Sequence, residues 1–136
     1  MAKLNPYLNI PGKCREMMEF YAASLEANLT LQTVADSPVA DQLPAKFQQQ
    51  ILHGVLEKGD LILMASDMSK HSSLIGNNVQ LCVNCTSEEE TQLYFSRLSA
   101  GGEINEPLQV MFWGGYFGAL TDRYGIHWIF NYESGK

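Results

Sequence analysis

Apolar and polar residues alternate at the start of the chain, and this pattern predicts a strand over Leu4–Ile10. Pro11 and Gly12 end that strand. Apolar residues then recur at i, i+3, i+4, i+7 and i+11 from Cys14, which predicts an amphipathic helix over Cys14–Leu25. Alternation returns over Leu29–Ala35 and predicts a second strand.

Two further apolar runs predict a β-hairpin. Ile51–Glu57 and Asp60–Ser66 are joined by Lys58-Gly59, a good hairpin turn. Pairing Glu57 with Asp60 sets Val55 opposite Ile62 and His53 opposite Met64, and these four side chains share one face. The segment 36–50 contains two prolines and little periodicity, so it is predicted to be a loop with room for a short helical turn.

The same order of elements follows a polar linker over 67–78. Ser87 and Glu90 form a capping box, which predicts a helix ending at Gly101-Gly102. The predicted strands of this half are Val79–Asn84, Glu103–Glu106 before Pro107, and a hairpin of Phe112–Thr121 and His127–Tyr132. Strand, helix and three strands therefore occur twice. This predicts an α+β fold in one domain over 1–136, with βαβββ modules at about 1–70 and 77–136.

Charge and composition narrow the class of protein. The formal net charge is −6, and the nine Lys and Arg residues form no cluster, so no nucleic-acid partner is expected. No apolar run has the length of a membrane span or a signal peptide, so no membrane partner and a cytoplasmic location are expected. The three cysteines are an odd number without disulfide-framework spacing, which suits a reducing compartment.

Short motifs along nearly the whole chain resemble a known family, the PhnB-like branch of the vicinal-oxygen-chelate (glyoxalase/bleomycin resistance/dioxygenase) superfamily. The closing segment, from Phe-Trp-Gly to Asp-x-x-Gly-x-x-Trp, is the part most specific to this branch. The motifs are Pro6-Tyr7-Leu8, Glu19-Phe20-Tyr21, His53 with Gly59-Asp60, Ser66-Asp67, Phe112-Trp113-Gly114, Phe117-Gly118, Thr121-Asp122, Tyr124-Gly125 and Trp128.

The resemblance implies two modules whose sheets curve around a cavity, often in a homodimer. It also implies that relatives with a metal take one ligand from the first strand and one from the last strand of each module. The strand faces turned away from the helices would line the cavity. On this chain those positions are Asn5, Tyr7, Asn9, His53, Val55, Ile62, Met64, Gln80, Cys82, His127, Ile129 and Asn131.

The positions equivalent to the metal ligands read Asn5 or Tyr7, Met64, Gln80 and Ile129. Thioether and alkyl side chains cannot bind a hard divalent cation, so metal-dependent glyoxalase or dioxygenase chemistry is disfavoured and no metal is expected. Some family members carry a methyltransferase name, but the sequence has no glycine-rich strand-to-helix turn of the kind a nucleotide-like cofactor uses, and no cofactor is expected.

The predicted ligand-binding residues are Tyr7, His53, Met64, Gln80 and Trp113. His53 is the candidate general base, and the alternative is a structural histidine bonded to a neighbouring strand or loop. The aromatic residues around Gly114-Gly115 either form one wall of an apolar site or make a core or dimer contact.

Three other candidates are interpreted as structural. His127 is expected to be a solvent-facing rim residue. Cys82 and Cys85 lie three apart on a strand and point to opposite sides, so they form no metal or redox motif, and Cys82 is expected to be a small buried residue. Asp67 and Asp122 end their hairpin arms at matching points, and each is expected to cap its own turn.

Three functions follow as hypotheses. The first is a small-molecule binding or sequestering domain that holds a partly apolar ligand without a metal. The second is a metal-independent isomerase or lyase in which His53 is the base and Gln80 or Tyr7 orients an oxygen. The third is a divalent-metal enzyme with unexpected ligands. The substrate itself cannot be read from the sequence.

Overall fold

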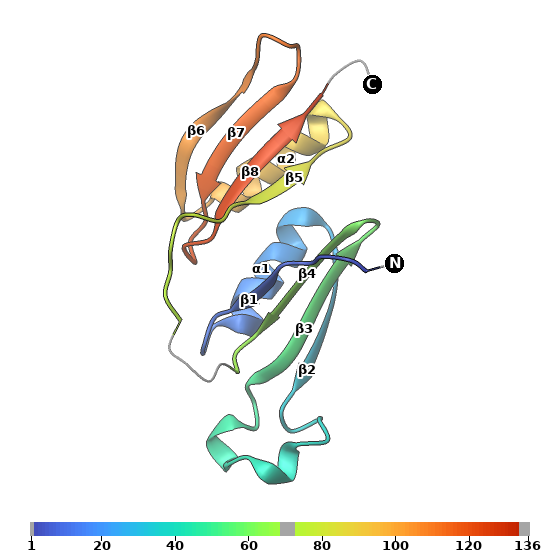
Figure 1. The fold of residues 1–136 in the computed structure, drawn as a ribbon, viewed down its shortest axis with the longest axis vertical. Coiled ribbons are helices and arrows are strands. Elements are labelled where there is room, and N and C mark those ends of the chain that lie inside the picture. Colours follow the sequence, from blue (N-terminus) through green and yellow to red (C-terminus); the bar gives the residue numbers. More distant parts are fainter. Residues whose placement is uncertain (1, 69–72, 134–136) are drawn as a thin grey trace. The chain divides into compact units, whose positions relative to one another are not determined.

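The computed structural model describes residues 2–68 and 73–133, so part of the predicted linker over 67–78 lies outside the described residues. The chain divides into two compact units, Met1–Leu74 and Ile75–Lys136, and each is described by itself (Figure 1). Each unit holds a four-stranded sheet with one α-helix against one face.

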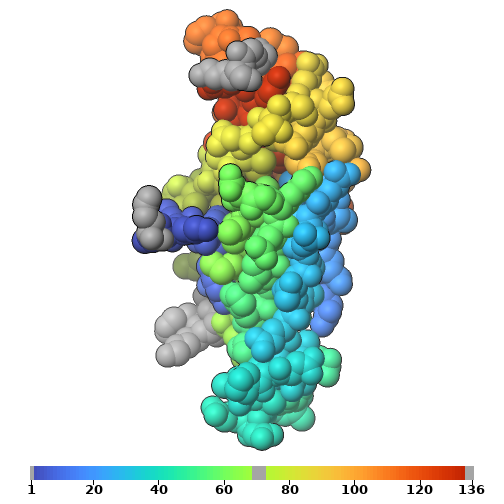
Figure 2. All heavy atoms as spheres, turned by 90° about the vertical axis from the view of Figure 1, so that its right-hand side faces the viewer, coloured from blue at the N-terminus to red at the C-terminus, as the bar shows by residue number. Residues whose placement is uncertain are grey.

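In the first unit the strands lie in the order β1-β4-β3-β2. β1 is parallel to β4, and the other neighbours are antiparallel. Two short 3₁₀ turns, Ala40–Gln42 and Ala45–Phe47, form the segment between β2 and β3, which Figure 2 shows as a lobe beyond the strands. The elements are β1 (Tyr7–Asn9), α1 (Cys14–Leu25), β2 (Asn28–Thr33), β3 (Ile51–Lys58) and β4 (Leu61–Ser66).

The second unit repeats this topology. Its sheet order is β5-β8-β7-β6, again with a parallel first pair, β5 and β8. The predicted α+β fold of two βαβββ modules is therefore confirmed, and neither sheet is closed. The elements are β5 (Leu81–Asn84), α2 (Glu88–Ser99), β6 (Glu103–Val110), β7 (Tyr116–Thr121) and β8 (His127–Tyr132). Among the described residues, no helix combines the length and the hydropathy needed to cross a bilayer.

Each unit has its own core between its helix and its sheet. In the first unit the apolar stripe of α1 contacts β3 and β4, and in the second α2 contacts β7 and β8. The helix-packing sides of the strands are those that the alternation predicts. Burying each large side chain contributes roughly 1.5–3 kcal/mol. Buried residues of the two cores include Cys14, Met17, Met18, Tyr21, Leu25, Leu56, Leu63 and Ala65 in the first unit and Thr91, Tyr94, Phe95, Leu98, Leu120, Trp128 and Phe130 in the second.

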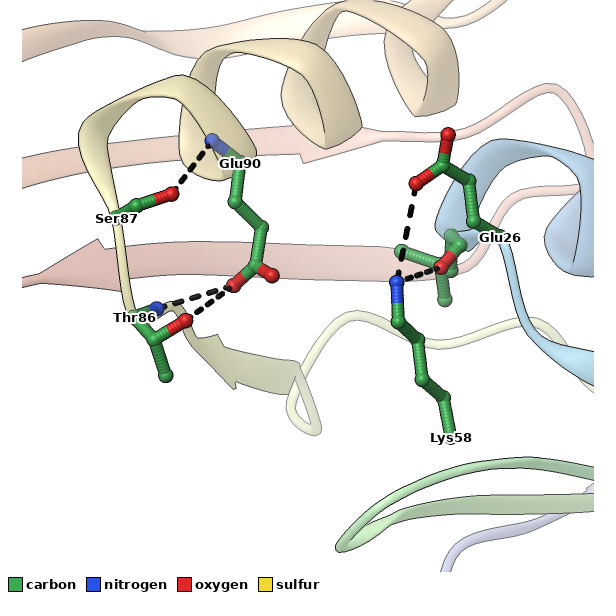
Figure 3. Close-up of polar contacts among 6 residues, drawn as sticks. Glu26, Lys58, Thr86, Ser87 and Glu90 are labelled. Carbon is green, nitrogen blue, oxygen red and sulfur yellow. Dashed lines mark hydrogen bonds and ion pairs between the residues drawn. The ribbon is translucent and has the colours of Figure 1, made fainter.

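The start of α2 confirms the predicted capping box. Ser87 Oγ accepts a hydrogen bond from the Glu90 amide at 3.0 Å (Figure 3). Glu90 Oε1 in turn accepts from the amide of Thr86 at 3.0 Å and from its hydroxyl at 3.3 Å. The return bond thus reaches one residue before the N-cap and fixes the chain just outside the helix.

The end of α1 is held by a cation from the neighbouring hairpin. Glu26 adopts a left-handed conformation with φ 54°, which ends the helix. Lys58 Nζ donates to the Leu25 carbonyl at 3.3 Å and pairs with Glu26 Oε1 at 3.8 Å (Figure 3). A positive charge at a helix C-terminus satisfies an orphan carbonyl and complements the helix dipole.

The predicted register of the β3–β4 hairpin is wrong by two residues. Val55 lies opposite Met64 and Glu57 opposite Ile62, so the two loop residues are Gly59 and Asp60. The reason is the loop geometry: its first residue needs a positive φ, and Gly59 supplies it at 56°. A shift of two residues leaves every side chain on its predicted face, whereas a shift of one would have turned each over.

The ends of several strands also differ from the prediction. β6 does not stop at Glu106 but runs through Pro107 to Val110, and two irregularities in its register with β7 accommodate it. Proline is tolerated there because β6 is an edge strand. The β7 strand begins at Tyr116 rather than Phe112, and β1, β2 and β5 are shorter than their alternating patterns.

Candidate functional site

The face of the first sheet turned away from α1 carries three of the predicted ligand-binding residues. Tyr7 on β1 is the register partner of Met64 on β4, and Met64 is in turn the partner of Val55 on β3. His53 lies two residues before Val55 on β3, so it shares that face. The strand pairing therefore sets Met64 between the strands that carry Tyr7 and His53.

The side chains of Tyr7 and His53 meet on this face. Their rings stack with centroids 5.8 Å apart and an interplanar angle of 27°. Tyr7 Oη lies 3.5 Å from His53 Nδ1, the long limit of a hydrogen bond. Tyr7 is 47% exposed and His53 is half-buried, so both rings remain accessible in part. The pair offers a flat aromatic surface together with groups that can donate, accept or transfer a proton.

Gln80 and Trp113 belong to the second unit and lie at opposite ends of its sheet. Gln80 is exposed and directly precedes β5, whose first residue pairs with Trp128 near the start of β8. Trp113 lies in the β6–β7 turn beside the end of β8, 46% exposed and in edge contact with Phe112 at 4.9 Å. The structure therefore brings Tyr7, His53 and Met64 together, and it separates Gln80 from Trp113.

The metal-equivalent positions are divided between the two units. Tyr7 and Met64 are neighbours on one sheet, and Ile129 pairs with Cys82 on the other. Across residues 2–68 and 73–133, no group of three or more His, Cys, Asp or Glu side chains is placed to hold a metal ion. Thioether and alkyl groups do not fit a hard divalent cation, so the side chains of Met64 and Ile129 offer no ligand to such an ion.

His127 is tied at both ring nitrogens. Its Nδ1 lies 2.8 Å from Thr121 Oγ1, and its Nε2 lies 3.1 Å from the Gly76 carbonyl. A carbonyl only accepts, so Nε2 carries a proton. His127 is half-buried rather than a free rim residue, and it anchors the chain that leads into β5.

Asp67 has a structural role other than the predicted turn cap. Asp67 is buried, and among the described residues both of its carboxylate oxygens accept from distant amides. Oδ1 accepts from the Cys14 amide at the start of α1 at 3.0 Å, and Oδ2 accepts from the Ile51 amide at the start of β3 at 2.8 Å. One side chain thus joins the beginnings of a helix and a strand that lie far apart in the sequence.

Asp122 does cap its own turn, as predicted, through the amides of Tyr124 at 2.8 Å and Ile126 at 3.1 Å. It also accepts from the Trp128 indole at 2.8 Å, which the sequence does not signal. The two aspartates are not at matching points, because Asp67 follows β4 and Asp122 follows β7. By sheet order, the equivalent of β4 is β8.

The cysteines differ in burial. Cys85 is buried and Cys82 is exposed, so the two lie in different environments as predicted, but the expectation that Cys82 is buried is wrong. Burial raises the pKa of Cys85 to about 11 and that of Cys14 to about 12. A high pKa leaves little thiolate near neutral pH, so neither buried thiol is activated as a nucleophile.

Comparisons with known proteins give one consistent family. A family model described as 3-demethylubiquinone-9 3-methyltransferase matches residues 2–130. Protein YjdN of Escherichia coli (strain K12) is 27% identical in an alignment 139 positions long, which covers 94% of this chain and 93% of YjdN. The crystal structure of PA1353 from Pseudomonas aeruginosa is 32% identical with a TM-score of 0.84, covering 98% of both chains.

A more distant solved structure shares the fold. A glyoxalase-related enzyme from Fulvimarina pelagi has a TM-score of 0.64 at 14% identity, over 98% of this chain and 89% of its own.

Proposed function

The chain belongs to the 3-demethylubiquinone-9 3-methyltransferase family, in the PhnB-like branch of the vicinal-oxygen-chelate superfamily, and from that premise we propose that it is a small-molecule binding domain that works without a metal ion. Its ligand is partly apolar. It lies against the open face of the first sheet and contacts Tyr7, His53 and Met64.

The stacked pair of Tyr7 and His53 carries this proposal. Two rings in contact on an exposed sheet face give a ligand a flat surface and two polar atoms, while Met64 offers a flexible apolar contact. Side chains with these properties orient an organic ligand. Gln80 and Trp113 are proposed as further ligand contacts on the family resemblance alone.

An isomerase or lyase is the second candidate, with His53 as the general base. The position of Tyr7 Oη beside His53 Nδ1 favours it, because a partner at one ring nitrogen orients the imidazole and leaves Nε2 for proton transfer. Tyr7 or Gln80 would then orient an oxygen of the substrate.

A dye titration tests the binding proposal. The probe is 1-anilinonaphthalene-8-sulfonate, whose fluorescence rises in apolar sites. Wild type treated with a chelator should bind it as tightly as untreated protein. His53→Ala and Tyr7→Ala should weaken binding at least about fivefold, on the order of 1 kcal/mol. Thr30→Ala is the matched control, because Thr30 shares the sheet face but lies on the far edge strand, and it should bind like wild type.

Three outcomes would count against the proposal. Equal binding by wild type and both ring variants would remove the site from this face. About one equivalent of a transition metal in purified protein, with binding lost on chelation, would favour a metal enzyme with unexpected ligands. Conversion of a bound ligand by wild type but not by His53→Ala, at an unchanged melting temperature, would favour the isomerase or lyase.

The family resemblance also predicts a homodimer, which sedimentation would report as twice the chain mass.

A further inference from the structure

Two tyrosine rings and one carboxylate meet beside the first turn of α2. Tyr116 begins β7 and Tyr132 ends β8, and these register partners have ring centroids 6.2 Å apart at an interplanar angle of 60°. Tyr116 Oη donates a hydrogen bond at 2.5 Å to Oε1 of Glu88, the first residue of α2. The three side chains therefore form one contiguous group in the second unit.

The two rings lie on the same side of the sheet as α2. Phe130 on β8 contacts Phe95 of α2 edge to face at 5.8 Å, and Tyr132 lies two residues further along β8, so it shares that face. Tyr116 is the register partner of Tyr132 and projects from the same face. Both tyrosines are half-buried and Glu88 is exposed, so all three side chains are accessible in part.

The polar atoms of this group are mostly hydrogen-bond acceptors. A carboxylate only accepts, so the bond to Glu88 uses the one hydroxyl proton of Tyr116. This bond, followed by burial and by the charge of Glu88, raises the pKa of Tyr116 above its ordinary value, and the phenol keeps that proton at neutral pH. Gln92 Nε2 donates to the same Oε1 at 3.5 Å. Within residues 2–68 and 73–133, Oε2 of Glu88 and the hydroxyl of Tyr132 have no hydrogen-bond partner.

The charge at this end of α2 is negative. The helix begins with three glutamates, at 88, 89 and 90, which outweigh the roughly half positive charge of a helix N-terminus. Between residues 73 and 133 the Lys and Arg residues are Arg97, in the last turn of α2, and Arg123, which donates to the Ala100 carbonyl just after that helix. Both cations are therefore at the opposite end of α2 from Glu88.

We infer that Glu88, Tyr116 and Tyr132 bind the primary ammonium group of a small organic cation. The ammonium brings N–H donors to a group of acceptors, Oε2 of Glu88 and the tyrosine oxygens. A cation is attracted to the face of an aromatic ring within about 6 Å of its centroid, and the two tilted rings offer such faces next to the carboxylate. This site lies in the second unit and does not rest on the proposed role of Tyr7 and His53.

Titration of the full chain with n-butylammonium chloride tests the inference, at neutral pH and constant ionic strength, followed through backbone ¹H–¹⁵N spectra. A dissociation constant on the order of 10 mM is expected for so small a probe at a partly exposed site, with the largest shifts at residues 88, 116 and 132. n-Butanol lacks the charge, and butyltrimethylammonium keeps the charge but lacks N–H donors. Each should bind at least about fivefold more weakly.

Two neighbouring glutamates provide matched variants. Glu88→Gln removes the charge and keeps the shape, and it should weaken n-butylammonium binding at least about fivefold. Glu89→Gln is the same change one position along the helix, where the side chain points about 100° away, and it should alter binding less than about twofold. Tyr132→Leu removes one ring and should weaken binding about threefold. If Tyr132→Leu is too unstable to titrate, the two glutamine variants, which change exposed side chains, still decide.

Three results would overturn the inference. Equal weakening by Glu88→Gln and Glu89→Gln would mean that the acidic start of α2 attracts cations without a defined site. Binding of n-butanol or butyltrimethylammonium as tight as that of n-butylammonium would remove the need for a primary ammonium group. The third is the absence of any saturable shift. None of these results bears on the dye titration of the first unit.

Discussion

Replacing Asp67 with alanine tests how much the two hydrogen bonds that join α1 to β3 stabilise the first unit. The carboxylate is only 8% exposed, and it accepts from the amides of Cys14 at 3.0 Å and Ile51 at 2.8 Å. A hydrogen bond to a charged group contributes about 1.5–3 kcal/mol, and Asp67→Ala leaves two amides without a partner at the starts of α1 and β3. We expect a loss of about 3–5 kcal/mol of unfolding free energy, a large part of the roughly 5–15 kcal/mol of a small domain.

Urea denaturation followed by far-UV circular dichroism measures this loss. Asp67→Asn is the milder companion, because its amide oxygen accepts from one of the two amides while its NH₂ cannot, and it should lose about 1.5–3 kcal/mol. Asp36→Ala is the matched control, since Asp36 is exposed, and it should change stability by less than about 0.5 kcal/mol. A loss below about 1 kcal/mol for Asp67→Ala would refute the reasoning that this side chain joins the helix to the strand.

Four further predictions concern other parts of the chain. An added Cβ at Gly115 would overlap a backbone carbonyl oxygen of β8, whereas Gly59 has open space around it and only a left-handed φ of 56°. In thermal denaturation Gly115→Ala should therefore cost about 1–3 kcal/mol and more than Gly59→Ala, and the reverse order would contradict the packing. Trp128→Phe removes the indole donor to Asp122 and should cost about 1–3 kcal/mol, whereas unchanged urea unfolding would mean that the bond contributes nothing. Burial raises the pKa of all three thiols, to about 12 for Cys14 and about 11 for Cys85. With a thiol reagent near pH 8, Cys82 should react first, because it is exposed and the other two thiols are buried. Those raised values also predict stability that falls as the pH rises above 9, because the unfolded chain releases protons that the folded state retains. Equal reaction rates for the three thiols of the native protein would contradict the first of these two predictions, and an unfolding free energy that does not change above pH 9 would contradict the second.

The hairpin of β3 and β4 shows how far alternation alone can predict a structure. A period of two assigns Val55, Ile62 and Met64 to one face whichever pairs are opposite, so the faces are correct even though the predicted register is off by two residues. The pairing itself depends on which loop residue takes the positive φ. Gly59 was available for that position in the sequence, but the predicted turn set it second instead of first.

The candidate site could be predicted from the sequence only where the position of a side chain follows from the alternation within its own strand. The faces of β3 and β1 that are turned away from α1 follow from parity, and the parallel pairing of β1 with β4 then brings Tyr7 beside Met64 and His53. That pairing joins segments more than fifty residues apart, and no periodicity within either segment encodes it. The bond of Asp67 to the start of α1 was missed for the same reason, since a single carboxylate before a polar linker looks like a turn cap.

The sequence by itself determined the elements, their order and the apolar side of each, because periodicity and capping are local properties. Only the tertiary structure decided which polar groups meet: Tyr7 with His53, Asp67 with two distant amides, and Asn84 with Asn131. Hydrogen bonds require atoms within about 3.5 Å, and for residues far apart in the chain that distance is set by strand register and helix packing rather than by any pattern along the sequence.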